Sequence, residues 1–321
     1  MRQPVIFIGM HRSGTSMLGR LLENLDLFVG AAKDENNEAI FFQDINAWLL
    51  RQSGAHWDVP GPIDYLGNNE EILPLVEDYV RNLIDSPRSL QFLGVRRYAA
   101  GGFASLDLAW GWKDPRNTFT LPVWLRIFPE AKVVSIERHG VDVAQSLKVR
   151  EARELASATK QYEKYRSIHF VRPKRGGFTA SPRCTSLKGG FSLWKEYTDR
   201  ARQMVAQLPA DRALTLRYED FLAEPVKYLR ASAEFCGLEA SDSTIRNVAA
   251  SIRAERSCSY LSDPELRRFA DEHHEELLAR GYGEAFRRPE SGIPACESGQ
   301  LHPGSIAGTS RPAREKLAQP L

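Results

Sequence analysis

The sequence has few cysteines, no long hydrophobic run and little net charge. Its four cysteines are scattered through 321 residues, and none forms a Cys-x-x-Cys pair or a zinc-binding spacing. No run approaches the roughly eighteen apolar residues that a membrane-spanning helix needs. The net charge of +2 is too small to indicate a polyanionic partner such as a nucleic acid. These absences argue against a zinc module, a membrane span and a nucleic-acid-binding protein.

The chain begins with an apolar run that leaves no space for a signal peptide ahead of it. A protein without a signal peptide is expected in the cytoplasm, where thiols stay reduced. We therefore expect a cytoplasmic protein in which Cys184, Cys236, Cys258 and Cys296 form no disulfides.

Residues 4–25 indicate a strand, a tight loop and a helix. A short β-branched apolar run from Val5 to Ile8 is followed by a loop bounded by Gly9 and Gly14. Apolar residues then recur at helical spacing, namely Met17, Leu18, Leu21, Leu22 and Leu25. Such a loop directs backbone N–H groups and the positive end of a helix at an anion. Further donors come from Arg12, Ser13, Thr15 and Ser16. The loop is predicted to bind a phosphate-like group.

The spacing nearly matches the nucleotide-binding pattern G-x-x-x-x-G-K-[ST], but Thr15 stands where that pattern has its lysine. Nucleoside-triphosphate enzymes use this lysine to reach the outer phosphates. Here the cation lies inside the loop, as Arg12. The loop therefore suits an anion whose transferred group lies beside an arginine better than it suits ATP cleavage. A kinase or NTPase that has lost its lysine stays the alternative.

The run from His11 to Ser16 resembles the 5′-phosphosulfate loop of sulfotransferases that use 3′-phosphoadenosine 5′-phosphosulfate (PAPS). Residues 128–149 resemble the second signature of that family, because a strand-like run is followed by Arg138 and, eight residues later, by Ser146. In the family, an Arg and a Ser at this spacing hold the 3′-phosphate. The resemblance implies PAPS as cofactor, no metal, and a cofactor site made of Arg12, Ser13, Gly14, Thr15, Ser16, Arg138 and Ser146.

A third segment, Lys-Asp-Pro-Arg at 113–116, resembles segments of tyrosylprotein and bacterial sulfotransferases. It would place Lys113 in the same crevice as Arg12. Sulfuryl transfer builds negative charge on the departing adenosine bisphosphate, and fixed cations stabilise such charge. We interpret Arg12 and Lys113 as those catalytic cations.

The general base is expected soon after the first helix, where the family often has a Glu or a His. Related bacterial chains often carry an acid where this sequence has Gln43. Glu35, Glu38 and Asp44 stay candidates, and we favour Glu38 because it precedes an apparent helix and could face the crevice. His11 is interpreted as a residue that orients the loop. The missing acid keeps open a non-catalytic binding protein on the same scaffold.

Strand-like runs alternate with helical stretches, at 4–9, 108–112, 131–136 and 212–218. This pattern predicts an α/β fold with one parallel sheet. The resemblance covers roughly 4–285 and implies a P-loop-like central sheet flanked by helices. We expect a single domain over 1–288 and a disordered tail over 289–321, which is rich in proline and glycine. Tyr218 and Glu219 are interpreted as scaffold.

Residues 159–190 carry eight cations, one acid and four glycines. This composition predicts a long loop over these residues, which is either a functional lid or a mobile insertion. The sequence does not name the acceptor. Aromatic residues near the expected mouth could stack on a sugar or belong to the core, namely Phe41, Phe42, Trp48 and Trp57. We expect a small-molecule or glycan acceptor, a carbohydrate or another hydroxylated metabolite, with protein tyrosine as the alternative.

Overall fold

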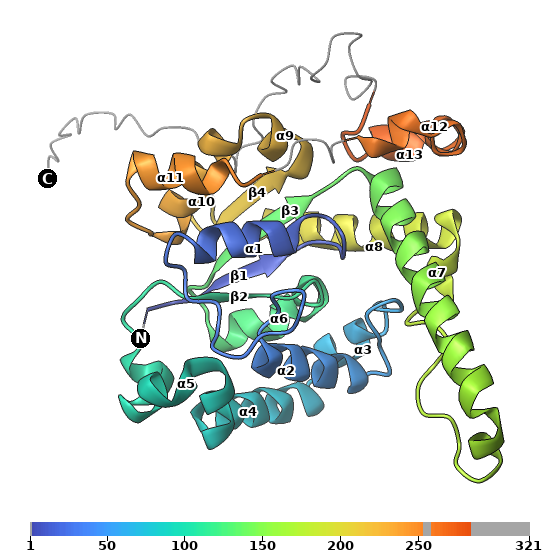
Figure 1. The fold of residues 1–321 in the computed structure, drawn as a ribbon. Helices are drawn as coiled ribbons and strands as arrows, with labels where there is room; N and C mark the ends of the chain where they lie inside the picture. Colours follow the sequence, from blue (N-terminus) through green and yellow to red (C-terminus); the bar gives the residue numbers. More distant parts are fainter. Residues whose placement is uncertain (1, 253–257, 284–321) are drawn as a thin grey trace, which may run out of the picture.

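The four apolar runs form the strands of one parallel sheet (Figure 1). The strands are β1 Val5–Ile8, β2 Gly111–Lys113, β3 Lys132–Glu137 and β4 Ala213–Arg217, in the order β2-β1-β3-β4. The computed structural model describes residues 2–252 and 258–283. Within them, the predicted α/β fold with a central parallel sheet flanked by helices is confirmed. The tail expected over 289–321 lies outside the described residues.

Strand β1 is buried on both faces, as a parallel central strand requires. Successive side chains of a strand point to opposite faces. Accordingly, Ile6 and Ile8 belong to one hydrophobic cluster, whereas Val5 and Phe7 belong to the other. In the first cluster, Ile6 lies beside Trp112 of the neighbouring strand. The sheet is therefore the middle of three layers.

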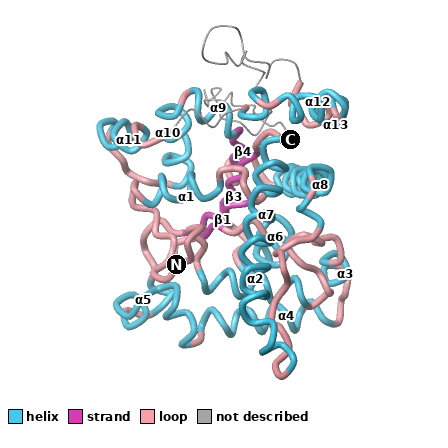
Figure 2. The backbone as a smooth tube through the Cα atoms, turned by 45° about the vertical axis from the view of Figure 1, so that its right-hand side comes forward, coloured by secondary structure: helices cyan, strands magenta, loops and turns pink. Residues whose placement is uncertain are grey.

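Helices cover both faces of the sheet (Figures 1 and 2). One layer consists of α1 Thr15–Glu23, α9 Tyr218–Ala223, α10 Pro225–Cys236 and α11 Asp242–Ala249. The other consists of α2 Ile40–Arg51, α3 Ile63–Gly67, α4 Ile72–Asp85, α5 Leu90–Ala99, α6 Asn117–Ile127 and α8 Leu187–Ala206. Three further helices are α7 Gly140–Tyr165, α12 Pro264–Glu272 and α13 His274–Leu278.

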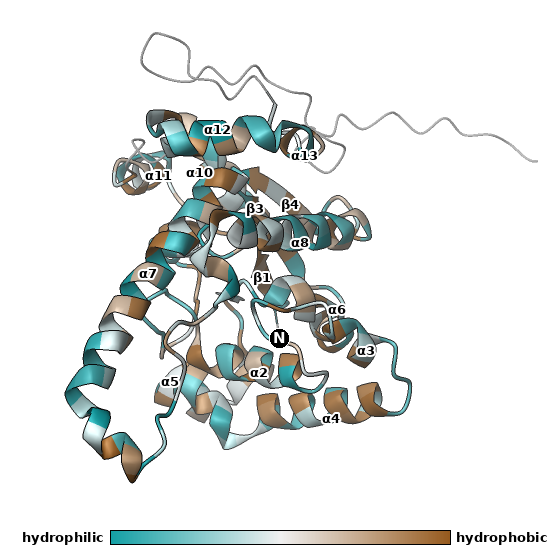
Figure 3. Ribbon diagram, turned by 90° about the vertical axis from the view of Figure 1, so that its right-hand side faces the viewer, coloured by the Kyte–Doolittle hydropathy of each residue, from teal (hydrophilic) through white to brown (hydrophobic). Residues whose placement is uncertain are grey.

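The prediction of a long loop over residues 159–190 is wrong at both ends. Helix α7 runs on to Tyr165, because residues 141–165 contain no proline or glycine that would end it. Helix α8 already begins at Leu187, where the Ser186 hydroxyl accepts the Gly189 N–H at 3.1 Å. The connection includes two short 3₁₀ turns, η3 Arg166–Phe170 and η4 Arg183–Thr185. Figures 1 and 3 show α7 projecting from the body as an arm.

Two sequence expectations concern thiols and membranes. Cys184 and Cys236 are buried free thiols, as predicted, while Cys296 lies outside the described residues. No helix in the described ranges combines the length and the apolar character needed to cross a bilayer.

Candidate active site

The loop between β1 and α1 has the backbone geometry of an anion cradle. Gly9 and Gly14 have φ angles of 133° and 101°, in the left-handed region that glycine tolerates. A Cβ at Gly14 would lie 2.5 Å from the Tyr218 ring, so only glycine fits there. Gly14 caps α1 without any side-chain hydrogen bond. The first N–H groups of α1 are therefore available to an anion.

Three residues predicted to bind the cofactor meet at this loop. The Arg12 Nε–H donates to the Ser146 hydroxyl at 2.8 Å, and Arg138 Nη1 donates to the Arg12 carbonyl at 3.3 Å. Arg12 belongs to the loop, Arg138 follows β3, and Ser146 lies in the second turn of α7. The structure therefore brings together groups from three separate segments around the start of α1.

Arg138 is held from two sides. Its guanidinium lies over the Tyr218 ring, 4.7 Å from the centroid, and donates to Asp142 at 3.3 Å. The buried Asp142 carboxylate also accepts hydrogen bonds from Ser259 and from the Tyr260 N–H. Sequence reasoning missed Asp142. The available signal was its spacing, because an acid four residues after Arg138 lies in the first turn of α7, within reach of that arginine.

Glu219 secures the backbone next to Arg138. Its carboxylate accepts the His139 N–H at 2.8 Å. Burial raises the pKa of Glu219 to about 7, partly offset by this hydrogen bond. Burial lowers the pKa of His139 to about 3, so its ring, stacked on Tyr260 at 4.1 Å, is neutral at pH 7. Tyr218 and Glu219 thus contact the segment that carries Arg138.

A buried ion pair joins Glu38 to Lys113, with 2.9 Å between Oε1 and Nζ. The other oxygen of Glu38 accepts from the Gln43 amide at 2.9 Å and lies 3.5 Å from Arg116. Burial raises the pKa of Glu38, and Asp114 acts in the same direction, while Lys113 and Arg116 oppose them. Glu38 thus lies between two cations, and its carboxyl group has a raised pKa.

Hydrogen bonds fix both sides of this pair. Asp34 accepts the Glu38 N–H at 2.8 Å, which closes the loop before α2. On the other side, Asp114 accepts from Asn46 at 2.8 Å and from Arg116 at 2.9 Å. Sequence reasoning assigned no role to Arg116, although it stands in the Lys-Asp-Pro-Arg segment.

Gln43 is a further group whose role sequence reasoning missed. It was seen only as the loss of an acid, whereas its amide bridges Glu38 and Asp34.

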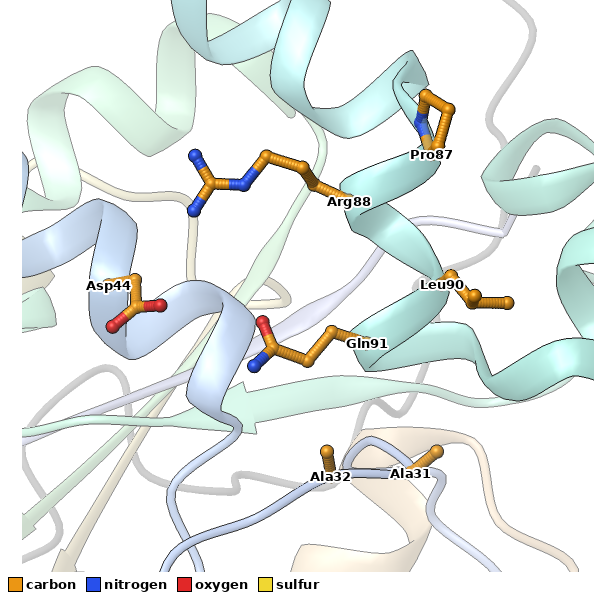
Figure 4. A pocket seen from close by; sticks show the side chains of 7 residues that line it. All are labelled: Ala31, Ala32, Asp44, Pro87, Arg88, Leu90 and Gln91. Atoms are coloured by element: carbon orange, nitrogen blue, oxygen red, sulfur yellow. The ribbon is translucent and has the colours of Figure 1, made fainter.

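The other two candidate bases are in different surroundings. Glu35 is exposed. Asp44 is also exposed and lines a surface pocket with Arg88 and Gln91 (Figure 4). Of the three candidates, Glu38 alone is buried and paired with Lys113.

His11 packs beside the loop. Its ring meets Trp57 edge-on at 4.9 Å and Tyr197 at 5.9 Å. Burial, together with Arg150 and the other nearby cations, lowers the pKa of His11 well below its ordinary value. The ring is therefore neutral at pH 7, and its contacts are those of a residue that supports the loop.

The aromatic residues near the expected mouth divide into two groups. Phe41 and Phe42 are core residues, and Phe42 stacks on Trp112 at 3.9 Å. Trp57 is half-buried and carries the Arg150 guanidinium 4.7 Å above its ring. Arg150 lies one helical turn after Ser146, a spacing that could have indicated it from the sequence.

In the parts of the chain that the structure describes, no three His, Cys, Asp or Glu side chains are grouped to hold a metal ion.

Both the sequence and the structure are similar to known proteins. A family model described as "Sulfotransferase family" matches residues 4–242. A search of curated proteins finds no match. Solved structures similar to this chain include a sulfotransferase domain from the curacin biosynthetic pathway, with 14% identity over 85% of this chain and 97% of that chain, at a TM-score of 0.47.

Two other solved structures are similar over most of this chain. The sulfotransferase from Alicyclobacillus acidocaldarius is 17% identical, with 87% of this chain and 94% of that chain covered, at a TM-score of 0.46. Mouse sulfotransferase SULT7A1 complexed with PAP is 14% identical, with 89% of each chain covered, at a TM-score of 0.44.

Proposed function

Because this chain belongs to the sulfotransferase family, we propose that it transfers a sulfuryl group from PAPS to a hydroxyl group of an acceptor. The observation that carries the proposal is the meeting of Arg12, Arg138 and Ser146 at the start of α1. A nucleotide with phosphates at both its 5′ and 3′ positions needs two anion sites; the start of α1 with Arg12 would supply one, and Arg138 with Ser146 would supply the other. A 3′-phosphate site has no use in an ATP-dependent kinase.

The loop residues fit the 5′ end of the cofactor. The N–H groups at the start of α1 lack a side-chain cap, and Ser13, Thr15, Ser16 and Arg12 surround them. Arg138 and Ser146 would hold the 3′-phosphate. PAPS, when bound, supplies the sulfuryl group and the leaving group on which negative charge develops.

Glu38 is proposed as the general base that takes the proton of the acceptor hydroxyl. A raised pKa makes a carboxylate a stronger base than an ordinary glutamate. Lys113 is neutralised by Glu38 in the resting protein. When Glu38 takes a proton its charge disappears, and the positive charge of Lys113 is then no longer balanced. Proton uptake by Glu38 is therefore coupled to the stabilisation, by Lys113, of the negative charge that develops on the leaving group.

We propose a carbohydrate or another small hydroxylated metabolite as acceptor. Trp57 supports this proposal, because it is half-buried beside His11 and carries the Arg150 guanidinium over its ring, so that an acceptor would contact the Trp57–Arg150 pair. Phe41 and Phe42 offer no such surface, since both are buried in the core.

Cofactor choice is tested by thermal shift of the full chain. We expect 3′,5′-adenosine bisphosphate to raise the melting temperature, and ATP with Mg²⁺ to leave it nearly unchanged. Stabilisation by ATP alone would refute PAPS dependence.

Catalysis is tested with ³⁵S-labelled PAPS and a panel of sugars, phenols and tyrosine peptides. Label should pass to sugars or other small hydroxylated compounds in the wild type, and at least about a hundredfold more slowly in Glu38→Gln. Binding of adenosine bisphosphate without any transfer would indicate a non-catalytic scaffold. Transfer to tyrosine peptides alone would correct the acceptor class.

A further inference from the structure

The tip of α7 and the helices α3 and α4 lie in the lower part of the molecule as drawn in Figures 1 and 3. Both regions carry exposed apolar side chains outside the site described above. The first, here called the arm tip, is residues 160–178 at the end of α7 and in the turn after it. The second, here called the acidic face, is residues 64–79 on α3 and α4. Four of the five most exposed large hydrophobic side chains in the described residues belong to them: Phe170 (89%), Val171 (84%), Tyr65 (78%) and Leu75 (70%).

The arm tip is basic. It contains one acid, Glu163, and six cations, namely Lys160, Lys164, Arg166, Arg172, Lys174 and Arg175. The exposed side chains of Tyr165, Ile168 and Phe178 surround Phe170 and Val171 in the sequence. Apolar side chains this exposed are costly in water, and exposed patches of this kind mark interaction sites.

The acidic face has the opposite charge. It contains five acids and no Lys or Arg. On α4, Ile72, Leu75 and Tyr79 follow helical spacing and are all exposed. Asp64 pairs with Arg200 and Glu77 with Arg126. The remaining acids form no ion pair within the described residues, namely Glu70, Glu71 and Asp78.

The arm tip lies far from the cofactor loop. Arg12 contacts α7 at Ser146, and the helix ends at Tyr165. At 1.5 Å per residue, the two positions are about 28 Å apart along the axis. The tip could reach the loop only if α7 bent sharply, and residues 146–165 contain no glycine or proline at which it would. The arm tip is therefore badly placed to act as a lid over the cofactor.

We propose that the arm tip of one copy docks on the acidic face of a second copy, and that the reciprocal contact completes a two-fold dimer. Each patch offers apolar side chains that the other can cover, and the charges are complementary. Two arm tips facing each other would repel. Because both patches lie in the lower part of the molecule as drawn in Figures 1 and 3, a two-fold axis can satisfy both contacts at once.

The test is a charge-swap experiment on the full chain, read by analytical ultracentrifugation. The wild type should sediment as a dimer at micromolar concentration. The tip variant Lys164→Glu/Arg172→Glu and the face variant Glu71→Lys/Asp78→Lys should each self-associate at least about tenfold more weakly. Mixing the two variants should restore a dimer, since both contacts then join opposite charges. The matched control is Lys227→Glu/Arg246→Glu on α10 and α11, which should stay dimeric.

All altered side chains are exposed, so circular dichroism should show unchanged folding. A monomeric wild type, dimeric single variants or a mixture that stays monomeric would each overturn the proposal. Binding of a monomeric wild type to phosphatidylserine vesicles through the same arm tip would assign the patch to an anionic membrane instead.

Discussion

The carboxylate of Glu38 and the ammonium group of Lys113 form a buried ion pair between residues 75 positions apart in the chain. The pair connects the loop before α2 to the end of β2. Removing one member leaves the other charge buried without its partner, which is far more costly than losing an exposed pair. Substitutions here therefore need a shape-conserving replacement.

Glu38→Gln is expected to lower kcat by about 10²–10⁴-fold, the usual contribution of a general base. Glutamine keeps an oxygen that can accept from Lys113, so adenosine bisphosphate should still bind. Turnover with the acceptor identified in the panel and isothermal titration with adenosine bisphosphate measure the two effects. Asp44→Asn, at an exposed acid outside this pair, is the control and should retain its activity. Turnover close to that of the wild type would exclude Glu38 as the base.

The same assignment predicts a pH profile. A base acts in its deprotonated form, so the rate rises with pH through its pKa. Burial raises the pKa of Glu38, so the acidic limb of kcat/KM should lie above the range of an ordinary glutamate. The limb should be absent in any residual activity of Glu38→Gln. An unchanged limb in the variant would assign it to another group.

Arg12→Ala is expected to raise the barrier by roughly 3–4 kcal/mol, the scale for losing one electrostatic donor at a site of developing charge. Alanine keeps a Cβ at the same backbone position, so stability should change little. Turnover at saturating PAPS and urea unfolding measure the two effects. Arg51→Ala, at an exposed arginine at the end of α2, is the matched control. Equal turnover in the two variants would remove Arg12 from the mechanism.

Arg138→Ala is expected to weaken PAPS binding by about 1.5–3 kcal/mol, the scale of a charged hydrogen bond. Ser146→Ala should cost less, because its hydroxyl is neutral. Titration with PAPS and with its analogue lacking the 3′-phosphate measures the preference, which should shrink in both variants. A wild type that binds the two compounds equally would have no 3′-phosphate site.

Glu219→Gln is expected to change how stability depends on pH. The pKa of Glu219 is about 7 in the folded protein, against 4.5 as its ordinary value. The folded state therefore holds the proton more tightly, and this contribution to stability is lost as pH rises from about 4.5 to about 7. His139 acts oppositely between pH 6.5 and about 3, because its folded pKa is lowered and stability falls as pH falls.

The difference between wild type and Glu219→Gln isolates the carboxyl group. We compare the free energy of unfolding of the wild type with that of the variant at each pH. The value for the wild type minus the value for the variant should fall by up to about 3 kcal/mol between pH 4.5 and 7.5. Urea unfolding at a series of pH values gives this difference. A constant difference would show that Glu219 has an ordinary pKa in the folded protein.

The features that the sequence predicted correctly are those that local patterns of residues determine. All four strands and the loop before α1 were expected within a few residues, because alternation, glycine positions and helical spacing are local. That Arg138 and Ser146 would both lie near Arg12 followed from a family spacing, which places one residue after β3 and the other near the start of α7. These elements account for most of the sheet and for the loop and side chains proposed to bind the cofactor.

The rest depends on contacts distant in sequence. Gln43 looked like the loss of an acid, because only the folded chain shows its amide on Glu38. Arg116 approaches Glu38 across 78 positions, which no local pattern reports. The length of α7 was misjudged because its basic composition and the glycines further on were read as loop, although no breaker interrupts the helix before Tyr165.

Arg12 has a φ angle of 70°, in the left-handed region of the backbone map. Glycine adopts this conformation without strain, whereas a residue with a side chain is strained in it. The chain therefore tolerates a cost of about 1 kcal/mol at this position, in the loop where the cation is proposed to act. Arg12→Gly would relieve that cost and remove the guanidinium in one step, giving a protein that is harder to unfold and less able to react. The stability lost at Arg12 is thus tied to the cation that is proposed to act in the reaction.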